Sequence, residues 1–180
     1  MAGIDQSRAF IAIRIALLTM SDTRTAEDDK SGNLLVELIT LAGHEVAERA
    51  IVKDDVTAIR ATVQRWISDR NIDCVITTGG TGFTGRDVTP EAVRPLFEKD
   101  IDGFSILFHM ISYQKIATST MQSRACAGVA GGTYIFCLPG SPNACRDAWD
   151  GILKYQLDAR HRPCNLVEIL PRLEEHKRDG

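Results

Sequence analysis

The sequence predicts an α/β protein with a mostly parallel central sheet covered by helices. Short apolar segments alternate along the chain with longer segments of helical periodicity, which is the order of strand–helix units. Most of these apolar segments lack the alternation of a half-exposed strand, so we expect them to be buried on both faces, as in a parallel sheet. The chain of 180 residues is long enough to bury a sizeable core. We expect a single domain over residues 1–180, with its core at about residues 10–165 and mobile ends.

Four strands are predicted from the apolar runs. Residues 14–20 (RIALLTM), 73–78 (DCVITT) and 133–138 (TYIFCL) are apolar almost throughout, whereas 45–52 (EVAERAIV) alternates. Right-handed crossovers place the carboxyl ends of parallel strands at one edge of the sheet, and ligands of open α/β sheets bind beyond that edge. The residues directly after each strand are therefore the first candidates for a site.

Helices are predicted between the strands from apolar positions at helical spacing. The first covers 32–44 and ends at Gly43, a favourable C-cap residue. The second covers 55–70 and places its apolar residues on one face. The remaining predicted helices are 89–99, interrupted at Pro95, then 103–115, a small-residue helix within 118–130, and 142–157, with the charged tail 171–180 expected to be mobile.

Composition and charge argue against several classes of protein. A net charge of −3 gives no attraction to nucleic acid or to membrane surfaces. No apolar run approaches the roughly 18 residues that span a bilayer, and the start MAGIDQSRAFIAIR lacks the pattern of a signal peptide. The five cysteines contain no Cys-x-x-Cys pair. We therefore expect buried, reduced thiols in a cytoplasmic protein rather than disulfides or a zinc site.

The segment VITTGGTGFTGRDVTPEAV (75–93) is the densest candidate for a binding loop. Four of its glycines fall within seven residues directly after a predicted strand, and such density suggests that a ligand comes close to the backbone. The loop matches G-x-G-x-x-G, but its helix begins only at Pro90 and no acidic residue ends a strand about 20 residues later. No Gly-Lys-Ser/Thr follows either. The pattern therefore argues against a Rossmann dinucleotide site and against a P-loop.

Two predicted helices begin with the same pattern at this edge. Thr89-Pro90 follows the glycine loop, and Ser141-Pro142 follows the strand that ends before Pro139-Gly140. Ser and Thr are good N-cap residues, and Pro suits the first helical position. Both helices are then expected to direct free N–H groups and positive dipole ends at the edge, an arrangement that binds phosphate.

Three aspartates accompany these loops. Asp87 follows the glycines, and Asp54 and Asp22 follow neighbouring strands. Carboxylates repel an anion unless a cation lies between them, and Mg²⁺ takes one or two carboxylates together with substrate phosphates. A functional role is predicted for Asp87, because a surface pair with Arg86 would add little stability. Helix capping by Asp54 and an Asx turn at Asp22 remain open as alternatives.

The segment TSTMQSRACAGVA (118–130) is ambiguous. Ser119, Ser123 and Arg124 can belong to a helix start or can bind a phosphate, and the sequence does not decide between the two. His109 lies on an apolar helix and is predicted to pack in the core. His161 is predicted to lie in a solvated tail rather than to extend an anion site.

The segment TTGGTGFTGRDVTPEAV resembles the signature of the molybdenum cofactor biosynthesis family, the MoaB/Mog proteins, which bind molybdopterin. Supporting stretches are LLTMSDTR, EDDKSGNLLVELITLAGHEV, IVKDD, GFSILFHMISYQKIATSTMQSRACAGV and LPGSPNACRDAWDGIL. The similarity spans roughly residues 10–165. The tail QLDARHRPCN and the short chain resemble the MoaB branch more than the Mog branch.

This resemblance implies a three-layer α/β/α fold and homo-oligomers, either trimers or hexamers built as dimers of trimers. It also implies adenylylation of molybdopterin with Mg-ATP, which gives adenylyl-molybdopterin and pyrophosphate. The two aspartates thought to matter in the family match Asp54 and Asp87, which we expect to be catalytic and to hold Mg²⁺. The residues expected to bind the substrates are Ser21, Asp22, Gly79, Gly80, Thr81, Gly82, Ser119, Ser123, Arg124, Pro139, Gly140 and Ser141.

Three functions remain to be separated. An adenylyltransferase releases pyrophosphate from ATP only with molybdopterin and Mg²⁺. A non-catalytic carrier binds the pterin tightly without converting nucleotide and leaves catalysis to a Mog partner. A dinucleotide-dependent oxidoreductase binds NAD.

Overall fold

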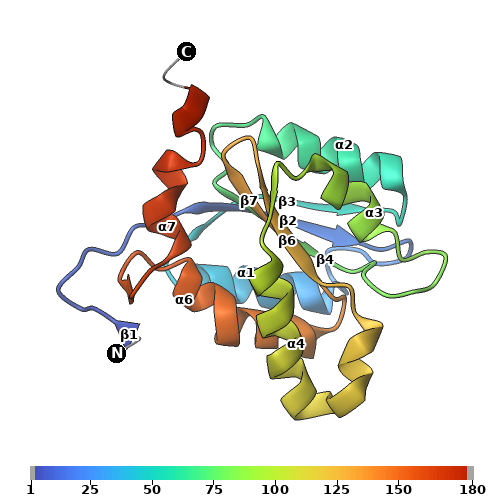
Figure 1. The fold of residues 1–180 in the computed structure, drawn as a ribbon. Coiled ribbons are helices and arrows are strands. Elements are labelled where there is room, and N and C mark those ends of the chain that lie inside the picture. The colour runs from blue at the N-terminus through green and yellow to red at the C-terminus, as the bar shows by residue number, and fades with distance from the viewer. Residues whose placement is uncertain (1–2, 178–180) are drawn as a thin grey trace.

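A computed structural model describes residues 3–177 and contains a six-stranded central sheet in the order β3-β2-β4-β7-β6-β5 (Figure 1). The four predicted strands run parallel: β2 (Arg14–Met20), β3 (Glu45–Val52), β4 (Cys74–Thr78) and β7 (Thr133–Leu138). Strands β6 (Cys126–Ala130) and β5 (Lys99–Asp100) extend the sheet in antiparallel fashion. Strands β1 (Gly3–Ile4) and β8 (His161–Arg162) form a separate antiparallel pair.

Helices cover both faces of the central sheet, so the predicted three-layer α/β/α architecture is confirmed (Figure 1). One face carries α2 (Val56–Ile67), α3 (Thr89–Val93) and the short 3-10 helix η1 (Arg94–Leu96). The other face carries α1 (Lys30–Leu41), α4 (Asp102–Ile116), α5 (Pro142–Ala148), the π-helical turn η3 (Trp149–Leu153), α6 (Lys154–Gln156) and α7 (Leu166–Ile169). Three more 3-10 helices are η2 (Ala117–Gln122), η4 (Leu170–Arg172) and η5 (Glu175–Lys177).

The sheet separates two apolar clusters. In β2, Ile15 and Leu17 face α1, while Ala16 and Leu18 face α2, and all four are fully buried. Strands with apolar side chains on both faces are what a sheet covered on both sides requires. The near-continuous apolar runs that predicted these strands therefore have their physical cause in this double burial.

The prediction of a helix within 118–130 is wrong, because residues 126–130 form strand β6. This strand pairs with β7 through a hairpin whose turn is Gly131-Gly132, with φ of +54° and +81°. A Gly-Gly pair is a strong signal for such a turn, and the small residues around it obscured the signal. Glycine at position 128 leaves room for the Phe97 ring to pack against β6, since a Cβ on Gly128 would lie 2.3 Å from that ring.

Other predicted boundaries differ more modestly. The helix predicted over 89–99 stops at Val93, continues as η1 and gives way to β5. Gly43 follows the C-cap of α1 with φ +89°, as its predicted role at the helix end requires. Residues 178–180 of the tail that was predicted to be mobile lie outside the described residues. In the described part of this tail, Glu174 forms an ion pair with Arg70. Among residues 3–177, no helix is both long enough and apolar enough to cross a bilayer.

Candidate functional site

The loops that follow β2, β3, β4 and β7 meet at the carboxyl edge of the sheet around a cleft of about 490 Å³. Its walls come from chain segments more than a hundred residues apart, because parallel strands bring their ends to one edge. The residues predicted to form the site that line the cleft are Ser21, Asp54, Gly79, Gly80, Thr81, Gly82, Asp87, Ser123, Pro139, Gly140 and Ser141.

The glycine loop turns sharply at its first two residues. Gly79 and Gly80 have φ of +107° and +62°, a backbone conformation that favours glycine. A Cβ on Gly79 would lie 2.7 Å from the carbonyl oxygen of Met20, and one on Gly80 would lie 2.4 Å from Thr89 Oγ1. Glycine is therefore needed here to pack the loop against its protein neighbours as well as to expose its backbone to the cleft.

The two helix starts differ from each other. Ser141 caps α5 by accepting a hydrogen bond from the Ala144 N–H at 3.1 Å, as predicted, and it lines the cleft. Thr89 does not cap α3; its hydroxyl donates to the Gly79 carbonyl oxygen at 2.9 Å and its N–H donates to Gly80 O. Pro90 lines a neighbouring groove instead. The predicted N-cap role is therefore confirmed for Ser141 and wrong for Thr89.

Asp54 and Asp87 line the same cleft, and the charge of Asp87 affects the titration of Asp54. Burial, followed by the charge of Asp87, raises the pKa of Asp54. Burial alone would also raise the pKa of Asp87, but hydrogen bonds from Thr84 and from the Gly82 N–H lower it. Asp55, not Asp54, caps α2, so the capping alternative for Asp54 is wrong. Hydrogen bonds thus favour the ionised form of the Asp87 carboxylate, whereas burial and the charge of Asp87 disfavour the ionised form of Asp54.

Three predicted ligands lie elsewhere. Asp22 is exposed and forms an ion pair with Arg86. Ser119 lies exposed on η2, outside the residues that line the cleft. Arg124 directs its guanidinium to the carbonyl oxygens of Gly82 and Asp87 and to the Glu91 carboxylate, and it lines the groove beside the cleft. Of the three ligands predicted in segment 118–130, only Ser123 lines the cleft, and its neighbour Gln122 lines it as well.

The sequence reasoning missed a cation at this site. Arg24 lines the cleft, and its charge lowers the pKa of Asp54, partly offsetting the burial. It is held by a hydrogen bond to Ser31 Oγ and by an ion pair with Asp29 at 3.8 Å. A basic residue four positions after a predicted strand end was the available signal. The other residues of the cleft that were not predicted are Met20, Thr23, Arg86 and Gln122.

Two histidines and the cysteines are the remaining residues that the sequence analysis considered. His109 is half-buried, and its ring nitrogens lie 2.7 Å from Ser105 O and 3.1 Å from Ser123 O. It therefore joins α4 to the segment that lines the cleft rather than packing wholly in the core. His161 is half-buried in β8. Four of the free cysteines are buried, as predicted, and Cys164 is exposed.

The donor set fits a hard divalent cation that shares its ligands with a substrate. Mg²⁺ takes oxygen ligands and keeps several positions for water or phosphate, so two carboxylates are enough. Within residues 3–177 no group of three or more His, Cys, Asp or Glu side chains is placed to hold a metal alone. A cation between Asp54 and Asp87 would also relieve the repulsion that raises the pKa of Asp54.

The chain is similar to several known proteins. A family model described as "Probable molybdopterin binding domain" matches residues 16–159. Molybdenum cofactor biosynthesis protein B of Escherichia coli (strain K12) is 52% identical over 159 residues, which cover 88% of this chain and 94% of that protein. A crystal structure of Molybdenum cofactor biosynthesis protein B has a TM-score of 0.84 and 43% identity, covering 93% of this chain and 99% of its own.

A second branch of solved structures is more distant. The molybdopterin biosynthesis Mog protein of Mycobacterium ulcerans has a TM-score of 0.74 at 27% identity, covering 92% of this chain and 99% of its own. The identities therefore place the chain nearer to the relatives named protein B than to this Mog protein. The chain belongs to the MoaB/Mog family of molybdenum cofactor biosynthesis proteins.

Proposed function

We propose that the protein binds molybdopterin in this cleft and adenylylates it with Mg-ATP, giving adenylyl-molybdopterin and pyrophosphate. The observation that carries the proposal is the pair Asp54 and Asp87, which line one cleft with the glycine loop and have opposite pKa shifts. In the reaction, the terminal phosphate of molybdopterin attacks the α-phosphorus of ATP, and the bond to pyrophosphate breaks. Mg²⁺ supplies charge neutralisation when bound, with Asp54 and Asp87 as its protein ligands.

The residues of the cleft act mainly by positioning and by charge. Two polyanions must approach each other, so the barrier falls when they are held in place and their charges are balanced. The open backbone at Gly79 to Gly82 allows close approach of the pterin phosphate, and the capped start of α5 at Ser141 presents a positive dipole end. Arg24 contributes a positive charge that lowers the pKa of Asp54.

A non-catalytic pterin carrier is the second candidate. The same cleft binds the pterin in that case, but no nucleotide is converted. The raised pKa of Asp54 favours the catalytic proposal. Burial and the charge of Asp87 make this carboxylate costly to ionise, and a protein that only carries the pterin gains nothing from that cost.

Pyrophosphate release separates the two candidates. With molybdopterin, ATP and Mg²⁺ present, the wild-type protein should release pyrophosphate, and omission of any one of the three should stop it. Asp87→Asn should reduce turnover at least a hundredfold while pterin binding is largely kept, since the carboxylate acts on the metal rather than on the pterin. Asp150→Asn, on the exposed surface of η3, is the matched control and should behave as wild type. Wild-type binding of the pterin with no pyrophosphate would assign the carrier function.

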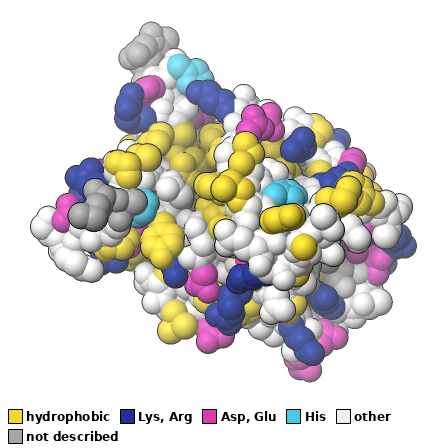
Figure 2. Space-filling view, turned by 60° about the horizontal axis from the view of Figure 1, so that its bottom comes forward, with side chains coloured by type: hydrophobic (Ala, Val, Ile, Leu, Met, Phe, Trp, Pro, Cys, Tyr) yellow, Lys and Arg dark blue, Asp and Glu magenta, His cyan; other side chains and the backbone are white. Residues whose placement is uncertain are grey.

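We also propose that the chain forms homo-oligomers, a trimer or a hexamer, and that α4 and η2 provide a contact surface. Figure 2 shows apolar side chains gathered on the face that includes these elements. The large apolar residues exposed there are Ile106, Leu107, Met110, Tyr113, Ile116 and Met121. Monomeric proteins rarely expose apolar patches of more than a few hundred Å².

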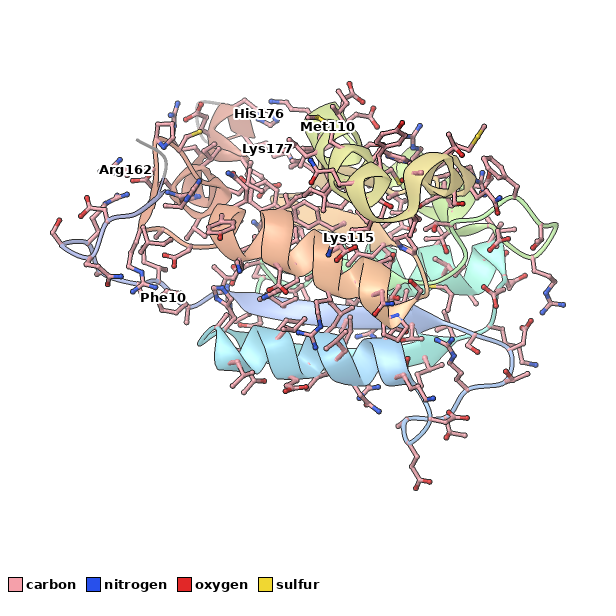
Figure 3. The ribbon with its side chains drawn as sticks, turned by 90° about the horizontal axis from the view of Figure 1, so that it is seen from below. Phe10, Met110, Lys115, Arg162, His176 and Lys177 are labelled. Carbon is pink, nitrogen blue, oxygen red and sulfur yellow. The ribbon has the colours of Figure 1, made fainter. Side chains whose placement is uncertain are left out.

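Two further features of this surface fit a partner. A hollow between α4 and η2 is lined by Ile106, Met110 and Tyr113 among others. At its base the hydroxyl of Thr120 is buried and finds no hydrogen-bond partner within the described residues. Met110 points away from the sheet, whereas Lys115 turns back to pair with Asp147 of α5 (Figure 3). A second copy would cover the apolar face and give the Thr120 hydroxyl a partner.

A further inference from the structure

The side chain of Arg124 binds backbone carbonyl oxygens of the glycine loop. Its Nε donates to Gly82 O at 2.8 Å and its Nη2 donates to Asp87 O at 2.7 Å. Its backbone N–H donates to Thr81 O at 2.9 Å. Three carbonyl oxygens spread along the loop are thus bound by one residue that lies more than thirty positions later in the chain.

The rest of the guanidinium is also occupied. It forms a two-point ion pair with the Glu91 carboxylate of α3, and it lies 5.7 Å from the centre of the Phe83 ring. A guanidinium has five N–H donors in a fixed plane, and at least four of them are used by these contacts. Arg124 therefore has little capacity left to bind a phosphate in the cleft.

The loop that Arg124 holds is the part that carries Asp87. Inside the loop, the Thr84 N–H and hydroxyl donate to Asp87 Oδ2, and the Asp87 N–H donates to Thr84 O. A Cβ on Gly82 would lie 2.8 Å from Asp87 Oδ2, so the two residues are packed closely. The Arg124 contacts with Gly82 O and Asp87 O hold the backbone of the turn, and the Thr84 contacts with Oδ2 restrain the direction of the Asp87 carboxylate.

The segment that bears Arg124 is itself anchored. His109 of α4 lies 3.1 Å from Ser123 O, and β6 begins two residues after Arg124. We propose that Arg124 is a positioning residue that, with Glu91, fixes the glycine loop and the direction of Asp87 and does not itself bind the substrate. This inference rests on the proposed function for its consequence in catalysis, but its structural part concerns the ligand-free loop.

The requirement is for arginine rather than for positive charge. The planar fork reaches two carbonyl oxygens and a carboxylate at once, whereas the single ammonium of lysine is a compact charge that cannot span them. Arg124→Lys should therefore behave like Arg124→Gln in its effect on the loop. If the charge bound a phosphate directly, lysine would restore much of the function instead.

Amide hydrogen exchange of the ligand-free protein tests the structural part. In Arg124→Gln and Arg124→Lys the amides of residues 82–89 should exchange about tenfold faster or more, because local opening of the loop becomes easier. Glu91→Gln should give a smaller increase in the same amides. Arg94→Gln, which changes an arginine of the same groove without these loop contacts, is the matched control and should leave the loop unchanged.

Turnover kinetics test the consequence. Both Arg124 variants should lower kcat of pyrophosphate release about ten- to a hundredfold while the KM for pterin changes little, since positioning of Asp87 is lost rather than a pterin contact. Loop exchange like wild type, exchange that rises evenly over the whole chain, or recovery of kcat by lysine would each overturn the assignment. If the wild-type protein releases no pyrophosphate, the proposed function fails, and the exchange result still decides the role of Arg124.

Discussion

At the scale of single residues, the ionisation of Asp54 links the proposed metal site to stability. Its pKa is raised by burial and by the charge of Asp87, so the folded protein binds a proton there more readily than the unfolded chain does. The ionised carboxylate therefore costs folding free energy above this raised pKa, and the cost shrinks as the pH falls from the raised pKa to the unfolded value.

Asp54→Asn should consequently stabilise the protein at pH 7 and abolish turnover. We expect a gain in the free energy of unfolding of up to about 1 kcal/mol, because the carboxylate is only partly buried. The gain should shrink as the pH approaches the ordinary aspartate value of 3.8. Urea unfolding at neutral and acidic pH measures it. A loss of stability at pH 7 would show that the carboxylate is better paired than the structure indicates.

The sequence predicted which residues line the cleft better than it predicted the contacts of those residues. Glycine density, Ser141 and the two aspartates could be found, because each needs only its neighbours along the chain to suggest a role. The roles of Thr89 and Arg124 could not, because their partners are set by tertiary packing: Thr89 bonds to Gly79 O, and Arg124 bonds to Gly82 O and Asp87 O. The position of Arg24 four residues after a predicted strand end was a weak signal, and only the folded structure shows that it lines the cleft with Asp54.

At the scale of elements, the start of α1 is fixed by a buried carboxylate. Asp29 is fully buried and accepts hydrogen bonds from Thr19 Oγ1 at 2.6 Å, from the Gly32 N–H at 2.9 Å and from Arg49 at 2.9 Å. Burial by itself would raise its pKa, yet these hydrogen bonds and the Arg49 charge lower it. The stability that Asp29 contributes is therefore present above its unfolded pKa and is lost as the pH falls through the lowered value.

Asp29→Ala should destabilise the protein by about 3–5 kcal/mol, because it removes a helix cap and leaves Arg49 without its buried partner. Asp28→Ala is the matched control: its carboxylate is exposed and bonds only to Thr25 in the same turn, so a loss below about 1 kcal/mol is expected. Chemical denaturation of both variants at pH 7 measures the difference. Equal losses would contradict a central role for Asp29.

Element prediction succeeded where burial on both faces left a long apolar run. It failed at β6, where the run CAGVA is short and its small residues suit a helix in isolation. Only the pairing of β6 with β7 decides its conformation, and that pairing depends on the turn at Gly131-Gly132. Two-residue strands such as β5 leave too little pattern to be recognised.

At the scale of the whole molecule, the exposed apolar face of α4 and η2 should control assembly. Met110→Glu places a charge in the centre of this face, where Met110 is 58% exposed, and should shift the oligomer toward monomers. Leu41→Glu, at 76% exposure on the end of α1, is the matched control and should leave assembly unchanged. Sedimentation or light scattering reads the outcome. A wild-type protein that stays monomeric at high concentration would remove the proposal.

The position of β7 in the sheet also constrains how the protein is made. This strand lies between β4 and β6 although it is the last of the six in the sequence, and its last residue, Leu138, accepts a hydrogen bond from the Gly79 N–H. While the chain leaves the ribosome, the backbone groups along one edge of β4 consequently stay unpaired until residue 138 has emerged, and such an edge invites aggregation. The cleft is also incomplete during this interval, because Pro139 and Gly140, which line it, are translated after most of its other lining residues.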